Sequence, residues 1–273
     1  MAQQRGPLDT EAYIRTSTLF AEKRKVLASE AVEELALDIV RRVSAMKHPV
    51  RTDAETLIAQ DSIAAFCDAL VQPSPTAALD FIQARQAEGV ARQAILHGYL
   101  AGAAQMLGAR WEADEAGFSD VIHGTGHLYS LLRAIQLEPR GKTSTELNRK
   151  SAVFAVVPGE THNFGVRLAA ETFREAGWTI DLQVGMTHDE LVQHVQQVEP
   201  DIIGLSLSTQ GRLEALVRLV IALRLVRPSS IIGVAPALNM RDDIIHKVAD
   251  VDAIFRDARA AVRDLDWMLQ LRV

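Results

Sequence analysis

The second half of the chain alternates short apolar runs with helical patterns, and this alternation restricts the fold more than any other feature. The apolar runs of strand length lie at 152–157, 179–184, 201–207, 230–235 and 252–255. Helical patterns separate and follow them, at 164–176, 188–198, 213–226, 240–248 and 257–271. Such alternation favours a parallel sheet with right-handed crossovers. We therefore predict a five-stranded, doubly wound, flavodoxin-like α/β domain over 151–273.

The first half has helical periodicity instead. Apolar residues between Val26 and Val43 recur at spacings near three and four, which is typical of a helix. Further helices are predicted over 54–71, 76–86, 90–111 and 119–135. These patterns indicate an α-helical bundle over 21–138, joined by short connections. The polar residues 1–20 are expected to be flexible, and the segment 139–150 has the composition of a linker.

Composition excludes several classes of protein. The net charge of the 273 residues is −6, without a concentrated basic stripe, which argues against direct binding of nucleic acid. A single cysteine, Cys67, excludes an intramolecular disulfide and a cysteine-rich metal site, and it fits a reducing cytoplasm. The N-terminus lacks the apolar core of a signal peptide, and no apolar run is long enough to span a bilayer. We expect a cytoplasmic protein without a membrane segment.

The run Glu160–Thr161–His162–Asn163–Phe164–Gly165 carries the most chemistry. It follows the first predicted strand and precedes a helix, and open α/β sheets bind ligands at that edge. Glu160 can hold one imidazole nitrogen of His162, which leaves the other for a metal. Gly165 lets a flat ligand approach the backbone. The alternatives are that His162 is a surface residue and that Glu160 caps the following helix.

The loop after the third strand offers hydroxyl groups to the same crevice. Ser206 and Ser208 follow that strand, and hydroxyls at such a place either start the next helix or contact a ligand. We favour ligand contact for Ser206 and leave both interpretations open for Ser208.

In the helical half, two aromatic residues and two histidines are candidates. Trp111 ends one predicted helix and Phe118 begins the next, so they either pack the bundle or cover a flat ligand. His123 and His127 lie four residues apart on one helical face. They are either ordinary core or surface histidines, or one of them is a second axial donor to a metal.

The Glu-x-His-x-x-Gly run resembles the Asp-x-His-x-x-Gly motif of cobalamin-binding domains, with Glu160 in place of Asp. The histidine of that motif is the lower axial ligand of cobalt in those domains, and His162 corresponds to it. Serines after the third strand line the slot for the nucleotide tail there. The fourth strand departs from the motif, because Val234–Ala235 stands where a Gly-Gly pair is usual.

Both halves together resemble the AerR/PpaA regulators of purple photosynthetic bacteria and the related SCHIC region of AppA. The shared residues in the helical half are Leu107, Gly108, Trp111, Asp114, Phe118, Asp120, Val121, Gly124, Thr125, Gly126, Leu131, Leu132 and Arg133. In the sheet half they are Pro158, Gly159, Glu160, His162, Phe164, Gly165, Phe173, Ala176, Gly177, Trp178, Gly204, Leu205 and Ser206. The likeness covers about residues 25–255.

This resemblance implies a cobalamin-binding sensor of light or redox state, not an enzyme, that regulates transcription through a partner repressor or other signalling protein. Adenosylcobalamin is the favoured cofactor. Haem, or a bilin beside the corrinoid as in photocobilins, is the alternative. His162 is the implied lower ligand, His123 or His127 the candidate upper ligand, and the helical bundle the cap. Light-sensing proteins of the CarH type share the architecture but add a DNA-binding domain. A homo-oligomer remains an open alternative.

Two other classes compete with the sensor. A corrinoid-carrier subunit of a methyltransferase also pairs helices with such a sheet, but it has to expose cobalt, which Trp111 would obstruct. An interaction module that has lost its ligand would fit the Val234–Ala235 replacement.

Overall fold

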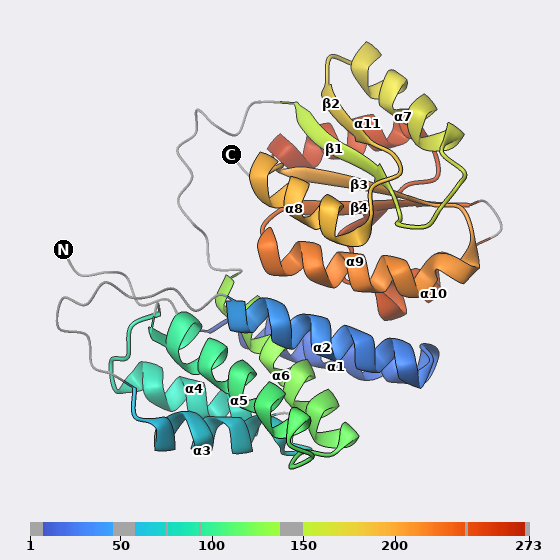
Figure 1. The fold of residues 1–273 in the computed structure, drawn as a ribbon. Helices are drawn as coiled ribbons and strands as arrows, with labels where there is room; N and C mark the ends of the chain where they lie inside the picture. The colour runs from blue at the N-terminus through green and yellow to red at the C-terminus, as the bar shows by residue number, and fades with distance from the viewer. Residues whose placement is uncertain are drawn as a thin grey trace. The chain divides into compact units, whose positions relative to one another are not determined.

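The computed structural model describes residues 8–45, 58–74, 76–92, 94–136, 150–237 and 240–270. The chain divides into two units, Met1–Glu138 and Pro139–Val273. Figure 1 shows a helical N-terminal unit and a C-terminal unit built on a sheet. The predicted order of a helical bundle followed by an α/β domain is therefore confirmed.

The N-terminal unit packs its helices around one central helix. α6 contacts α1, α2, α3, α4 and α5. The elements are α1 Thr10–Val26, α2 Ser29–Ala45, α3 Gln60–Val71, α4 Ala77–Ala87, the π-helix η1 Ala94–Leu100, α5 Ala101–Glu112 and α6 Phe118–Gln136. The predicted helix over 90–111 is thus a π-helical segment followed by an α-helix. The start of the predicted 54–71 helix falls partly outside the described residues, and α3 begins at Gln60.

The prediction that residues 1–20 are flexible is wrong for the second half of that segment. α1 begins at Thr10, and the Asp9 side chain caps it by accepting a hydrogen bond from the Ala12 amide at 2.9 Å. Tyr13 and Phe20 are buried, because α1 packs along α6. Most residues of α1 are polar, so its sequence shows no clear sign of this apolar face. The helix predicted from Val26 to Val43 corresponds to α2, which begins at Ser29, while Val26 is the last residue of α1.

The C-terminal unit has five parallel strands in the order β2-β1-β3-β4-β5. This is the flavodoxin-like arrangement that the alternation predicts. The strands are β1 Ser151–Val156, β2 Thr179–Gln183, β3 Ile202–Leu207, β4 Ile231–Pro236 and β5 Ala253–Ile254. The helices are α7 Phe164–Glu175, α8 His188–Val198, the 3-10 turn η2 Gln210–Arg212, α9 Leu213–Val226, α10 Asp242–Val248 and α11 Ala258–Gln270.

Helices cover both faces of the sheet, with α7 and α11 on one face and α8, α9 and α10 on the other (Figure 1). The core under α7 and α11 contains an aromatic chain. The ring of Phe173 lies edge-on to Phe154 at 4.9 Å and to Trp178 at 5.3 Å between ring centroids. Trp178 directly precedes β2, so this end of the cluster lies at the amino end of that strand.

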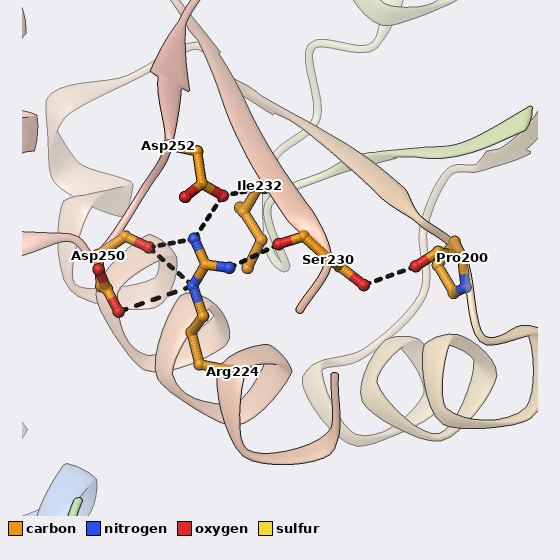
Figure 2. A network of polar contacts seen from close by, with 6 residues as sticks. All are labelled: Pro200, Arg224, Ser230, Ile232, Asp250 and Asp252. Atoms are coloured by element: carbon orange, nitrogen blue, oxygen red, sulfur yellow. Dashed lines mark hydrogen bonds and ion pairs between the residues drawn. The ribbon is translucent and has the colours of Figure 1, made fainter. Parts of the chain in front are cut away.

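A buried arginine fixes the opposite end of the sheet. Arg224 of α9, whose side chain is 1% exposed, donates to the carbonyl oxygens of Ser230 and Asp250 and to the Asp252 carboxylate (Figure 2). Ser230 in turn donates its hydroxyl to the Pro200 carbonyl at 2.6 Å. The network therefore ties together the amino ends of β3, β4 and β5.

Candidate functional site at the carboxyl ends of the strands

A cavity of about 630 Å³ opens at the carboxyl ends of the strands. Its walls come from α7 and α11, its floor from β1, β3 and β4, and its rim from the loops that follow these strands. Most of its lining is apolar, with Phe173 and Leu265 among the side chains. A cavity of this size and character suits a small-molecule ligand or cofactor, and it lies where doubly wound sheets bind ligands.

Two glycines form the centre of the floor. Gly204 of β3 pairs with Gly233 of β4 in the sheet register. A methyl group on Gly204 would lie 2.8 Å from the ring of Phe154, and one on Gly233 would lie 2.5 Å from the ring of Phe255. No other residue type fits without moving these rings, because real carbon contacts are longer than 3 Å.

The position of the glycine on β4 corrects the sequence-based expectation. Gly233 and Ala235 line the cavity, and Ala235 is exposed. Val234 does not line the cavity and is fully buried, since side chains on a strand alternate between the two faces. Val234 therefore does not obstruct the slot, and the glycine that the floor requires is one residue earlier than expected.

His162 stands at the rim with its side chain accessible. It follows β1, borders the cavity, and keeps 74% of its side chain exposed. Beside it, Glu160 has a side chain that is only 2% exposed, with its Oε2 4.0 Å from Nδ1 of His162. The imidazole is thus available to a ligand, and a buried carboxylate lies next to it.

Glu160 does not cap the following helix. α7 begins at Phe164 after Asn163, whose side chain makes no capping hydrogen bond. Instead, Oε1 of Glu160 accepts hydrogen bonds from the amides of Ser208 and Thr209, at 3.0 and 2.9 Å, and from the Thr209 hydroxyl at 3.1 Å. The carboxylate joins the loop after β1 to the loop after β3.

The other residues of the motif divide into two groups. Phe164 and Gly165 border the cavity, and Phe164 is 78% exposed. Thr161 and Asn163 are not part of the cavity wall, and the side-chain oxygen of Asn163 accepts a hydrogen bond from Arg167 at 3.1 Å.

The two serines after β3 also differ. Ser206 and Ser208 both line the cavity, as expected. The Ser208 hydroxyl, however, donates to the backbone carbonyl of His162 at 3.3 Å. Of the two hydroxyls, that of Ser206 remains the better candidate for a ligand contact.

In the helical unit, each candidate histidine already has one nitrogen engaged. Nε2 of His123 lies 3.1 Å from the Arg24 guanidinium, and Nδ1 of His127 lies 2.8 Å from the Leu70 carbonyl. Burial lowers the pKa of both imidazoles, and the nearby Arg24 lowers the pKa of His123 further. An arginine can only donate, so Nε2 of His123 is an acceptor there. A carbonyl can only accept, so Nδ1 of His127 is a donor.

The aromatic pair of the helical unit keeps apolar surface in solvent. Trp111, near the end of α5, is partly exposed, and Phe118, at the start of α6, is 40% exposed. They are therefore not simply core residues of the bundle.

Several residues of the site were not expected to belong to it. They are Phe154, Gly233, Phe255 and Arg256, together with Gly204, which the sequence marked only as shared with the resembling family. Arg256 holds the rim by donating to the carbonyl oxygens of Ala237, at 2.7 Å, and of Met240. The glycines could have been found, because they lie two residues before Ser206 and Ala235 and so share their face of the sheet.

Comparisons with known proteins agree with this geometry. Residues 150–266 match the family model of the B12 binding domain. An uncharacterized 20.5 kDa protein from the bchF-crtJ intergenic region of Rhodobacter capsulatus is 25% identical over 122 residues, which is 45% of this chain. The match spans 64% of that relative, just under two thirds of its length.

Solved structures with some likeness include a novel cobalamin-binding protein from Desulfitobacterium hafniense, 20% identical, with a TM-score of 0.40 over 77% of this chain and 98% of that one. The monomethylamine corrinoid protein of Methanosarcina barkeri is 18% identical, with a TM-score of 0.38 over 77% and 99% of the two chains. Within the described residues, no helix has the length and apolar character that a membrane crossing requires. The residues that match the B12 binding domain, 150–266, lie within the C-terminal unit.

Proposed function

We propose that this chain binds a cobalamin, with His162 as the lower axial ligand of cobalt and the nucleotide tail in the cavity. The observation that carries the proposal is an exposed imidazole at the rim of a cavity of about 630 Å³ with a paired-glycine floor. The residues fit the cofactor. His162 supplies a nitrogen donor at the rim, and the apolar walls of the cavity suit an aromatic base.

We further propose that the protein is a sensor of light or redox state that acts through a partner repressor. The likeness of both units to AerR/PpaA regulators supports this role, as does an acidic balance of −6, which disfavours direct contact with DNA. Bound adenosylcobalamin supplies a cobalt–carbon bond that visible light cleaves. The helical unit is the element proposed to respond, with His123 or His127 as candidate upper ligand.

The cofactor proposal is tested by absorption spectra of the protein with hydroxocobalamin. His162→Ala should abolish the histidine-ligated spectrum and weaken binding. His246→Ala, which removes an exposed histidine of α10, is the matched control and should change neither. A His162→Ala variant with an unchanged spectrum would contradict His162 as the ligand.

The sensor proposal needs a separate measurement. Size-exclusion chromatography of the adenosylcobalamin-loaded protein, in the dark and after illumination, with and without a candidate repressor, should show a light-dependent change of assembly. The energy needed is modest, because about 5 kcal/mol of differential binding switches a two-state element almost completely. Identical profiles, with photolysis verified by absorbance, would favour the corrinoid-carrier alternative.

A further inference from the structure

The lining of the cavity is mostly apolar, but a group of charged side chains stands at one part of its rim. Arg256, Asp257 and Arg259 line it there, from the loop after β5 and the first turn of α11. All three residues are exposed. The contacts that each one already makes decide which of these charges is available to a ligand.

Arg256 and Asp257 are both engaged by the protein itself. The Arg256 guanidinium donates to two carbonyl oxygens of the loop after β4 and to the Asp242 carboxylate. Oδ1 of Asp257 accepts a hydrogen bond from the Ala260 amide at 2.7 Å, in the first turn of α11. The charge of Arg256 is therefore balanced by a carboxylate, and the carboxylate of Asp257 stabilises the start of a helix.

Arg259 is the charged group of this rim that remains available. Within the ranges that the structure describes, its side chain has no hydrogen bond and no ion pair. A guanidinium is charged at any physiological pH, and its planar fork of donors matches the oxygens of a phosphate or carboxylate. The cavity thus combines an apolar interior with an available cation at its mouth, which suits a ligand that has an apolar body and an anionic group.

We propose that Arg259 binds the phosphodiester group of the cobalamin nucleotide tail and makes the site selective for corrinoids that carry a phosphate. The inference rests on the proposed function and deepens it, because it assigns the charged part of the ligand to one side chain. The tail joins an aromatic base to a single negative charge. α11 offers a surface for each part, since Ala261 and Leu265 are buried in the cavity wall and Arg259 lies exposed at the start of the helix.

Three corrinoids separate the contribution of the charge from that of the base. Hydroxocobalamin carries the phosphodiester and the base, cobinamide phosphate carries a phosphate group without the base, and cobinamide carries neither. The dissociation constant of each is measured by absorbance titration of the full chain. A residue that contacts the phosphate affects the first two ligands and spares the third.

The variants are chosen to separate charge from shape. Arg259→Met keeps most of the apolar stem and removes the charge, whereas Arg259→Lys keeps the charge and removes the planar fork. The matched control is Arg263→Met, four residues further along α11, because Arg263 is exposed but is not part of the cavity wall.

Arg259→Met should weaken the binding of hydroxocobalamin and of cobinamide phosphate about three- to tenfold, a moderate loss because solvent screens an exposed charge. The affinity for cobinamide should not change. Arg259→Lys should recover part of the loss, and Arg263→Met should bind all three ligands as the unaltered protein does. Raising the salt concentration from about 0.05 to 0.5 M should reduce the difference between Arg259→Met and the unaltered protein.

The thermal melting of each variant without cofactor shows whether the fold is intact. Arg259→Met should melt with the unaltered protein, because this side chain has no hydrogen bond to lose in the described part of the chain.

The proposal is overturned if Arg259→Met keeps the affinity for hydroxocobalamin, or if it weakens cobinamide as much as the two phosphate-bearing corrinoids. An equal loss in Arg263→Met would overturn it too, since the effect would then be one of overall charge. A failure of the proposed function looks different, because the unaltered protein would then bind none of the three corrinoids.

Discussion

Gly204 on β3 is the register partner of Gly233 on β4, and an aromatic ring lies against each of them. The rings belong to Phe154 and Phe255, at the two sides of the cavity floor. Each ring occupies the space that a side chain at the glycine beside it would need, so both rings keep their places in the cavity wall only while the two positions are glycine.

The glycine floor predicts a tail-specific loss of binding. Gly233→Ala would place a methyl group 2.5 Å from Cε2 of Phe255, and forcing a methyl into a packed site costs about 1–3 kcal/mol. We expect the affinity for cobalamin to fall about tenfold, which corresponds to the lower part of that energy range. The loss should be smaller for cobinamide, which lacks the nucleotide tail. Gly211→Ala is the control, because nothing lies within 4 Å of its added methyl. Equal losses for both corrinoids would contradict a tail in this cavity.

The Arg224 network predicts a large loss of stability (Figure 2). Arg224→Met keeps the volume but removes the donor to the carbonyl oxygens of Ser230 and Asp250, and it leaves Asp252 with the Ile232 amide as its remaining donor. Each buried carbonyl group left without its hydrogen bond costs about 1–3 kcal/mol in the free energy of unfolding, measurable by urea denaturation. Arg241→Met removes an exposed pair with Asp243 and should change little. A small effect at Arg224 would mean that the amino ends of β4 and β5 are held by other contacts.

Burial of His127 predicts a pH dependence for the helical unit. Its pKa is lowered from 6.5, mainly by burial, so the unfolded chain takes up a proton at a pH where the folded chain does not. Stability is therefore complete above about pH 6.5 and falls as the pH drops toward the lowered value. His127→Asn should flatten the fall in a series of denaturation curves from pH 7 to 5, because asparagine keeps a donor near Leu70 and does not titrate. His246→Asn should keep the slope of the unaltered protein, and an unchanged slope in His127→Asn would refute the assignment.

The exposed aromatic residues of the helical unit predict an effect on photochemistry. If Trp111 covers the upper face of the cofactor, Trp111→Ala should leave adenosylcobalamin bound but change the rate of photolysis and its reversal in the dark. Flash photolysis followed by absorbance measures both. Trp267→Ala, at a 59% exposed tryptophan of α11, is the control and should leave the kinetics unchanged. Unaltered kinetics in Trp111→Ala would remove this residue from the proposed site.

The sequence by itself determined the class of fold and the place of His162. The change of hydrophobic period separates a helical unit from a parallel α/β unit, and a residue that follows the first strand of such a sheet has to lie at its carboxyl edge. The place of Gly233 could also have been predicted, because side chains alternate along a strand. Gly233 and Ala235 therefore share one face of the sheet, and Val234 lies on the other.

The tertiary structure alone decided what each polar group contacts. Glu160 was expected either to hold His162 or to cap the helix that follows it. The hydrogen-bond donors to its carboxylate come instead from Ser208 and Thr209. Likewise α1 looked too polar to be ordered, yet Tyr13 and Phe20 are buried because α6 offers them a surface. Periodicity reports the contacts that repeat along one element. A hydrogen bond between two loops, or the burial of one helix against another far along the chain, depends on where the folded chain brings them together.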